Sequence, residues 1–370
     1  MLRSPNPPAP QVRYAPLPPP PSTSHAASCP RVTSRDMPVY ERGEVLEILA
    51  SRPGLQRVAL LIGSERSFAY VLTDVTGPVD VGNAVIVNTT AVELGLGTGG
   101  WHVVHWNLAR DSFRAGAGRE VKARYLSTQV NVEAADGDTT DLAGMPVVVA
   151  GLHSQVAAIA VAIKDAQQNV RVAYVMTDGG ALPLAISDVV FELRERGLLD
   201  VTITCGQAFG ADHEAVSVYS ALGIARQAAD VAIVAMGPGG MGTDSPLGFS
   251  AIEVGPVLDA VARMGGVPIA TLRASALDVR ARHRGVSHHS TTALTTATSA
   301  RALVAAPSGV EIPPGIRARH RVIEIAPIGI VDAMKHHGLA IESMGRPAAD
   351  DPLLFECAAA AGVLASRELP

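Results

Sequence analysis

Acidic and histidine side chains follow several apolar runs of this chain. Asp178 lies in the polar segment 177–183, and Asp212 and His213 lie in the segment 205–214. Carboxylates and imidazoles are the side chains that enzymes most often use to move protons. The sequence therefore predicts Asp178, Asp212 and His213 as acid–base residues. The neighbouring Glu214 can also be read as a first-turn acid that a helix dipole stabilises.

A second group is the basic segment 273–290, in which Asp278 is the only acid although the whole chain has a formal net charge of −5. Guanidinium groups suit carboxylates and phosphates because they donate two parallel hydrogen bonds. The segment predicts a site for a small anion, and a solvated basic loop is the plainer alternative. The anion-binding residues predicted here are Arg282, His283, Arg284, His288 and His289.

The histidines of this segment also allow a divalent metal, with Asp178, Asp212, His213 or His153 as further ligands. Their spacing matches no closed zinc motif, so the sequence leaves the metal open.

Glycine-rich turns add candidate ligand contacts. Residues 237–242 match the GxGxxG pattern after an apolar run, and Ser245-Pro246 is expected to begin a helix there. No acidic residue closes a second strand at the spacing of a dinucleotide site, which disfavours a dinucleotide and leaves a phosphate or carboxylate cradle and a plain glycine turn as equal alternatives. The predicted ligand contacts are His153, Ser154, Gly179, Gly180, Gly237, Gly239 and Gly240.

The three cysteines, Cys29, Cys205 and Cys357, are few and far apart, so they predict no disulfide framework and fit a reducing cytoplasm. Cys205 could act as a nucleophile with His213 as its base, or it could be a small buried apolar side chain.

The elements that must position these groups follow an alternating pattern. Apolar runs at 147–150, 171–176, 201–204, 231–236 and 267–272 alternate with helical stretches at 155–167, 184–196, 214–228 and 251–264. Such alternation predicts βαβ units and a Rossmann-like, mostly parallel sheet flanked by helices over residues 145–370. Further strands are expected at 302–306 and 322–325, and a last helix with Asp351 as N-cap and Pro352 in its first turn. Because parallel strands end at one edge, the polar segments should converge there.

The N-terminal part has a different pattern. Short apolar runs at 57–62, 67–72, 84–87 and 102–106 predict a small β-rich module over 37–133, for which a partly closed barrel is one arrangement. Residues 1–36 are rich in Pro, Ser and Ala and predict a disordered tail, with a proline-rich docking motif as the alternative.

Composition excludes some classes of function. The acidic balance does not favour nucleic acid or an acidic membrane surface. No apolar run reaches the roughly 18 residues that span a bilayer, so a cytoplasmic protein is expected.

Four strings of the sequence, at 88–91, 151–155, 176–183 and 283–289, are familiar together. With them the chain resembles an uncharacterised family of actinobacterial and other Gram-positive proteins, classified as a domain of unknown function, from about residue 38 to the C-terminus. The resemblance implies a bacterial, cytoplasmic protein and brings no catalytic residues.

These observations favour an enzyme, a hydrolase or transferase, that acts on a small anionic metabolite. The alternative is a regulatory module that binds a nucleotide or metabolite without turnover, and a third reading is a scaffold that binds protein through the β-rich module. The oligomeric state stays open.

Overall fold

The computed structural model describes residues 39–95, 99–116, 118–135 and 139–369. Residues 38–370 form one compact unit. The tail predicted at 1–36 lies outside the described residues. No helix in the described part of the chain is long and apolar enough to cross a membrane.

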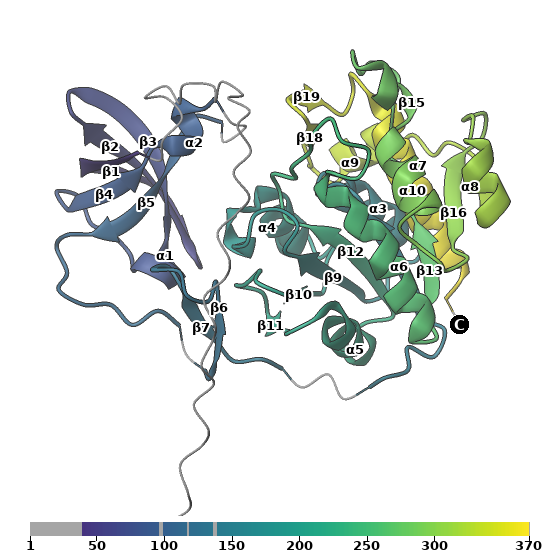
Figure 1. Cartoon of the computed structure of the whole chain (residues 1–370), viewed down its shortest axis with the longest axis horizontal. Coiled ribbons are helices and arrows are strands. Elements are labelled where there is room, and N and C mark those ends of the chain that lie inside the picture. The colour runs from purple at the N-terminus through teal and green to yellow at the C-terminus, as the bar shows by residue number, and fades with distance from the viewer. Residues whose placement is uncertain (1–38, 96–98, 117, 136–138, 370) are drawn as a thin grey trace, which may run out of the picture. The chain divides into compact units, whose positions relative to one another are not determined.

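The N-terminal strands close into a barrel in the order β1-β2-β3-β5-β4 (Figure 1). Its core is formed by alternating valines, leucines and alanines of the strands, among them Val58, Leu60 and Val85, which are fully buried. The four predicted strands are confirmed. The bounds are β1 Tyr40–Arg52, β2 Leu55–Ile62, β3 Glu65–Leu72, β4 Ala84–Asn88 and β5 Trp101–Asn107, with short helices α1 Thr73–Thr76 and α2 Thr90–Glu93.

Strand β1 was not predicted, for a physical reason. Two register irregularities interrupt its pairing with β2, and most of its side chains are exposed. A bulge shifts the side chains behind it to the other face, so the strand loses the simple two-residue alternation that marks a half-buried strand.

The large sheet has eight strands, all parallel, in the order β11-β10-β9-β12-β8-β13-β16-β17. Its central strands are continuous apolar runs that are buried on both faces, as parallel sheets require. The predicted strands are confirmed. Their bounds are β8 Pro146–Ala150, β9 Val172–Thr177, β10 Val201–Thr204, β12 Val231–Met236, β13 Val267–Ala270, β16 Leu303–Pro307 and β17 Arg321–Ile325.

Helices cover both faces of this sheet, and the two faces have separate apolar cores. One face carries α3 Gln155–Ala166, α4 Asp188–Glu195, α9 Ile330–His336 and α10 Pro352–Arg367. The other carries α5 Val218–Ala228, α6 Val254–Arg263, α7 His288–Thr295 and α8 Pro314–Arg319. Helix α10 lies directly on α3 because Gly362 faces the backbone of Ile159: a Cβ at position 362 would stand 2.6 Å from the Ile159 carbonyl oxygen.

Some element boundaries differ from the sequence-based prediction. The stretch expected to be helical from 214 begins instead with the edge strand β11 His213–Glu214, and α5 starts only after a capping box at Ser217. Residues 184–196 are divided into the 3₁₀ helix η2 Leu184–Ile186 and α4, which the Ser187 side chain caps. Asp351 holds the N-cap position of α10, but its carboxylate accepts hydrogen bonds from Ser275 Oγ and Ala276 N rather than capping the helix.

The remaining elements are short. They are β6 Glu120–Lys122, β7 Val130–Val132, η3 Ser250–Glu253, β14 Ala274–Ser275, η4 Ala281–His283, β15 Gly285–Val286, β18 Glu342–Ser343 and β19 Arg346–Pro347.

A buried ion pair joins β6 to the edge of the large sheet. Lys122 Nζ lies 2.6 Å from Glu214 Oε2 and also donates to the carbonyl oxygens of Thr204 and Ala208. The side chains of Lys122 and Glu214 are only 6% and 11% exposed. Loss of one partner of such a pair leaves the other charge buried without compensation.

We therefore expect Lys122→Met to lower the free energy of unfolding by about 3–5 kcal/mol. Arg66→Met, which removes an exposed ion pair with Glu47, should change it by less than about 1 kcal/mol. Urea unfolding of both variants measures the difference. Equal effects of the two substitutions would contradict a structural role for the buried pair.

Candidate functional site

The strand order of the large sheet places a switch point at the carboxyl edge of its central strands, the position at which open parallel sheets form a ligand crevice. After β8 the chain leaves the position of β12 empty and forms β9 and β10 toward one side of the sheet. It then reverses direction, fills the gap with β12, and forms β13, β16 and β17 toward the other side. Right-handed crossovers in opposite directions put the following helices on opposite faces. The loops after β8 and β9 therefore lead to one face, and those after β12 and β13 lead to the other. In open parallel sheets, ligands bind at the carboxyl edge where the chain changes direction in this way.

Two of these loops lie in direct contact. Ala181 N donates to the Pro238 carbonyl oxygen at 2.7 Å, and a Cβ at Gly180 would stand only 2.3 Å from the Gly237 carbonyl oxygen. The predicted contacts Gly179, Gly180, Gly237, Gly239 and Gly240 thus lie at one edge, after the neighbouring strands β9 and β12. At Gly180 the glycine is required by close packing of two backbones.

The loop at 237–242 does not open a helix. Residues 239–242 are exposed, and Gly242 pairs with Phe249 as an isolated bridge. The expectation that Ser245-Pro246 begins a helix is wrong: these residues lie in a turn closed by Thr243, and the next helical residue is Ser250. No helix N-terminus follows the glycines directly, so an anion bound there would gain no helix dipole.

His153 is buried and lies three residues after the end of β8. Its Nε2 lies 2.7 Å from Ser187 Oγ, and its Nδ1 lies within hydrogen-bond distance of the Tyr174 hydroxyl and the Met236 carbonyl oxygen. Burial lowers its pKa to about 4, so the ring is neutral. Its neighbour Ser154 donates to Ser343 Oγ.

Asp178 lies at the crevice edge but faces β10. Its carboxylate accepts from Gln207 N, and a Cβ at Gly206 would stand 2.3 Å from Asp178 Oδ2. Asp178 therefore fastens the loops after β9 and β10 to each other.

Asp212 and His213 do not join this crevice. Asp212 accepts from Thr202 N and Thr202 Oγ1 and forms an ion pair with Arg194. His213 is part of the edge strand β11. Cys205 is buried, and burial followed by the charge of Asp178 raises its pKa to about 12, which opposes a thiolate nucleophile.

A carboxylate that the sequence analysis did not select does lie at the crevice. Glu253, at the start of α6, accepts from Thr177 Oγ1 at 2.5 Å, and the missing side chain of Gly179 leaves room for its Oε2. Burial, with the nearby charge of Asp178, raises the pKa of Glu253 to about 7, although the hydrogen bond from Thr177 acts in the opposite sense. A carboxyl group with this pKa can both donate and accept a proton near neutral pH.

Most arginines of the basic segment already have an acidic or carbonyl partner. Arg280 binds Asp278 through two hydrogen bonds, which hold the pKa of Asp278 far below its usual range. Arg282 forms an exposed ion pair with Asp244, and Arg284 lies 3.4 Å from the Asp278 carbonyl oxygen. The predicted anion contacts Arg282 and Arg284 are thus exposed, partnered side chains.

Arg273 differs from these arginines because its guanidinium is mostly buried and has weak acceptors. Among the described residues, Nη1 faces His289 Nδ1 at 3.1 Å, Nη2 faces the sulfur of Met344, and Asp278 is 4.0 Å away. Burial, together with the charge of Arg280, lowers the pKa of Arg273 to about 10, so it remains charged at neutral pH.

Arg273 lines a small hollow between β8 and β13. Gly151, Val254, Thr271, His289 and Ser290 also line it. Within the described part of the chain, the buried Oγ1 of Thr271 has no hydrogen-bond partner, and neither does Oε1 of the neighbouring Gln155, whose amide nitrogen binds the Leu272 carbonyl oxygen. Buried polar atoms without partners are rare, and of these two residues only Thr271 lines the hollow.

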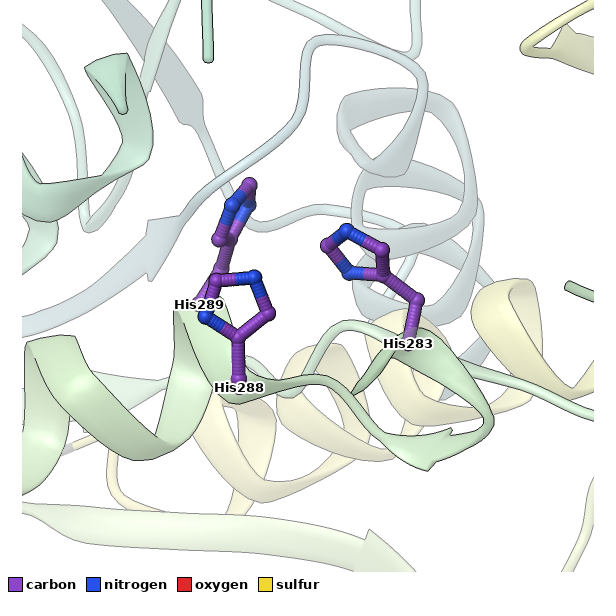
Figure 2. Close-up of side chains that lie close together, drawn as sticks. All are labelled: His283, His288 and His289. Atoms are coloured by element: carbon purple, nitrogen blue, oxygen red, sulfur yellow. The ribbon is translucent and has the colours of Figure 1, made fainter. Parts of the chain in front are cut away.

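The three predicted histidines lie together beside this hollow, and Figure 2 shows their imidazoles directed toward one space. They come from η4 and from the first turn of α7. Burial, together with the charges of Arg273 and Arg280, lowers the pKa of His283 to about 4; burial and then Arg273 lower that of His289 to about 3. The pKa of His288 is also lowered, first by burial. All three rings are therefore neutral near pH 7.

The raised pKa of Glu253 predicts a pH dependence of stability. Between about pH 4.5, the value of the free side chain, and about pH 7, the folded state holds a proton that the unfolded state has lost, so the free energy of unfolding falls as the pH rises. Glu253→Gln removes this decline. At pH 8 the variant should be more stable than wild type by about 1–3 kcal/mol.

Urea unfolding at pH 5 and pH 8 measures this effect, with the exposed Glu311→Gln as a control that should keep the wild-type profile. A Glu253→Gln protein that loses stability from pH 5 to pH 8 as wild type does would show that Glu253 is ionised throughout.

Comparison with known proteins gives a family but no activity. No curated protein matches the chain, and no solved structure matches it. One family model matches residues 67–362, which covers the last strands of the barrel and nearly all of the large sheet with its helices. The chain therefore belongs to the family described as "Protein of unknown function (DUF3866)".

Proposed function

We propose that this protein is an enzyme that acts on a small anionic metabolite, bearing a phosphate or carboxylate group, in the crevice at the carboxyl edge of the large sheet. The observation that carries this proposal is the buried guanidinium of Arg273, whose nearest partners are a ring nitrogen, a thioether sulfur and a carboxylate at 4.0 Å. A guanidinium has five N–H donors and binds an oxyanion through two of them at once.

The polar atoms around Arg273 support a ligand of this kind. Thr271 Oγ1 and the ring of His289 border the same hollow as the guanidinium, so an anion there would meet neutral donors besides the charge. The site differs from the one expected from sequence: Arg273 replaces the exposed Arg282 and Arg284 as the main anion contact.

The catalytic step that we assign to this crevice is proton transfer by Glu253, consistent with a hydrolase or a transferase. Glu253 lies between Ala251 and Val254, both of which line the hollow, and its carboxyl group itself lies beside Thr177 and Gly179 at the end of β9. A pKa of about 7 places it close to the optimum for general acid–base catalysis at neutral pH. Asp178 supports this role through its negative charge, which raises the pKa of Glu253 further.

The sheet order favours a substrate other than a dinucleotide. The fold is Rossmann-like in two respects: helices cover both faces of the parallel sheet, and the proposed ligand lies at its carboxyl edge. In a dinucleotide fold the first two strands are neighbours, whereas here β12 separates β8 from β9.

A binding module without turnover is the second candidate. It is favoured because His213 lies on the edge strand and Asp212 directly before it, away from β13 and Arg273, although both groups were expected to supply acid–base chemistry. The buried free thiols of Cys205 and Cys357 fit either protein in a reducing cytoplasm.

The anion site is tested by titrating the protein with inorganic phosphate and with malonate. Arg273→Leu should weaken binding of the anion that wild type prefers by about tenfold to a hundredfold, because a charge-assisted hydrogen bond contributes about 1.5–3 kcal/mol. Arg282→Leu, which removes an exposed arginine from the same segment, should leave the affinity nearly unchanged. If Arg282→Leu weakens binding and Arg273→Leu does not, the anion binds on the exposed loop.

Catalysis is tested by incubating the protein with a metabolite extract and following its anionic components by mass spectrometry. We expect wild type to consume one component, and Glu253→Gln to slow this by about a hundredfold or more while it still binds that component. A wild-type protein that binds a metabolite tightly and never converts it would be the regulatory module instead.

A further inference from the structure

The three histidines beside the hollow form a compact triangle (Figure 2). The ring centroids of His283 lie 4.8 Å from those of His288 and His289, and the latter two lie 4.4 Å apart. One nitrogen of each ring can be chosen so that all three lie within 4.8 Å of one another. Around a tetrahedral zinc ion, two ligating nitrogens are about 3.3 Å apart, so the histidine nitrogens must approach one another by up to about 1.5 Å to close the triangle.

The surrounding residues orient these rings. Ser287 Oγ lies 2.7 Å from His283 Nδ1, which leaves His283 Nε2 for the cluster. The ring of Phe249 stacks on His289 at a centroid distance of 3.9 Å and an angle of 5°. Within the described part of the chain, His288 Nε2 is buried without any hydrogen-bond partner. A buried imidazole nitrogen normally binds a hydrogen-bond donor, a hydrogen-bond acceptor or a metal ion, and the described residues offer His288 Nε2 neither a donor nor an acceptor.

We propose that His283, His288 and His289 bind one divalent transition-metal ion, with Zn²⁺ as the expected ion. Neutral imidazole nitrogens are the ligands of catalytic zinc sites with three histidines, which keep a fourth position open for water or an anion. None of Asp178, Asp212, His213 and His153, which the sequence offered as further ligands, belongs to this cluster. The inference does not depend on the proposed reaction.

His289 links metal binding to Arg273. A guanidinium can only donate, so its contact at 3.1 Å makes His289 Nδ1 the acceptor and leaves the proton of the neutral ring on Nε2. If His289 binds the metal through Nε2, its proton must move to Nδ1, which can then no longer accept from Arg273. If it binds through Nδ1, the lone pair that accepts from Arg273 is used for the metal. Metal binding therefore breaks the contact between His289 and Arg273 and frees the guanidinium for an anion in the hollow.

A metal ion at this site would be repelled by the nearby arginines, and negative charge close by lowers that repulsion. Asp278 lies 2.9 Å from Arg280 and 4.0 Å from Arg273, so one carboxylate already offsets part of the positive charge. An anion held by both the metal and Arg273 would offset more. Metal and anion should accordingly strengthen each other's binding, by the same factor in both directions.

The test uses the full-length protein without a histidine tag. Calorimetric titration with Zn²⁺ alone should show one site, and Co²⁺ should produce the intense visible absorption of a four-coordinate ion. His288→Gln and His289→Gln should each weaken Zn²⁺ binding by at least about tenfold and abolish the Co²⁺ spectrum. The matched control is the double variant His336→Gln/His337→Gln, which removes the other adjacent histidine pair at the end of α9 and should bind as wild type does.

Arg273→Leu separates this inference from the proposed function, because it should lose the anion and keep the metal. X-ray absorption at the zinc edge of the wild-type protein gives a measurement that needs no variant, and it should count three imidazole ligands. Absence of tight Zn²⁺ binding by wild type would overturn the proposal, as would binding that survives His288→Gln and His289→Gln but is lost in the control.

Discussion

The handedness of the crossovers in the large sheet is the constraint from which the candidate site follows. Because the chain runs from β8 toward β10 and then turns back through β12 to β17, its helices must divide between the two faces. The division sends the loops after β8 and β9 to one face and those after β12 and β13 to the other. Glu253, Thr271 and Arg273 lie at the edge where these loops begin, and each of them is partly or fully buried.

Among the described residues at this edge, charges are arranged so that Arg273 lacks a strong acidic partner. Asp278 is held by Arg280, Asp244 by Arg282, and Asp351 by Ser275 and the backbone. Arg273 is left with the His289 ring and the Met344 sulfur as its closest side-chain partners in the described part of the chain. Burial and, after it, the positive charge of the arginines lower the pKa values of the three histidines, and in our proposal the same positive charge attracts an anion to the hollow.

Much of the fold could be predicted from the sequence. Strands such as β10 and β12 are apolar runs bounded by polar or glycine residues, and a run that is buried on both faces leaves a plain local signal. Strand β11 leaves no such signal, because a strand of two residues has no periodicity. Helix α7 leaves no signal either, because it begins at His288-His289, in a segment of charged and polar residues without a helical apolar pattern. The breaks in β1 hid its alternation in the same way.

The site was predictable in position but not in all its members. Gly179, Gly237 and the three histidines were selected because they follow strands, and parallel topology brings such residues to one edge. Glu253 follows no strand: it reaches the crevice from the start of α6, through a contact with Thr177 that lies 76 positions away in the sequence. Likewise, the difference between Arg273 and Arg282 depends on burial and on the partner Asp244, which local sequence does not reveal.

The central claim is that an anion binds at Arg273 in the crevice between the loops after β8 and β13. The most direct measurement is the anomalous diffraction of a crystal soaked in tungstate, an electron-dense analogue of phosphate. We expect a peak within hydrogen-bond distance of the Arg273 guanidinium and near Thr271 Oγ1. A peak held instead by Arg282 and Arg284 on the exposed loop, with none at Arg273, would contradict it.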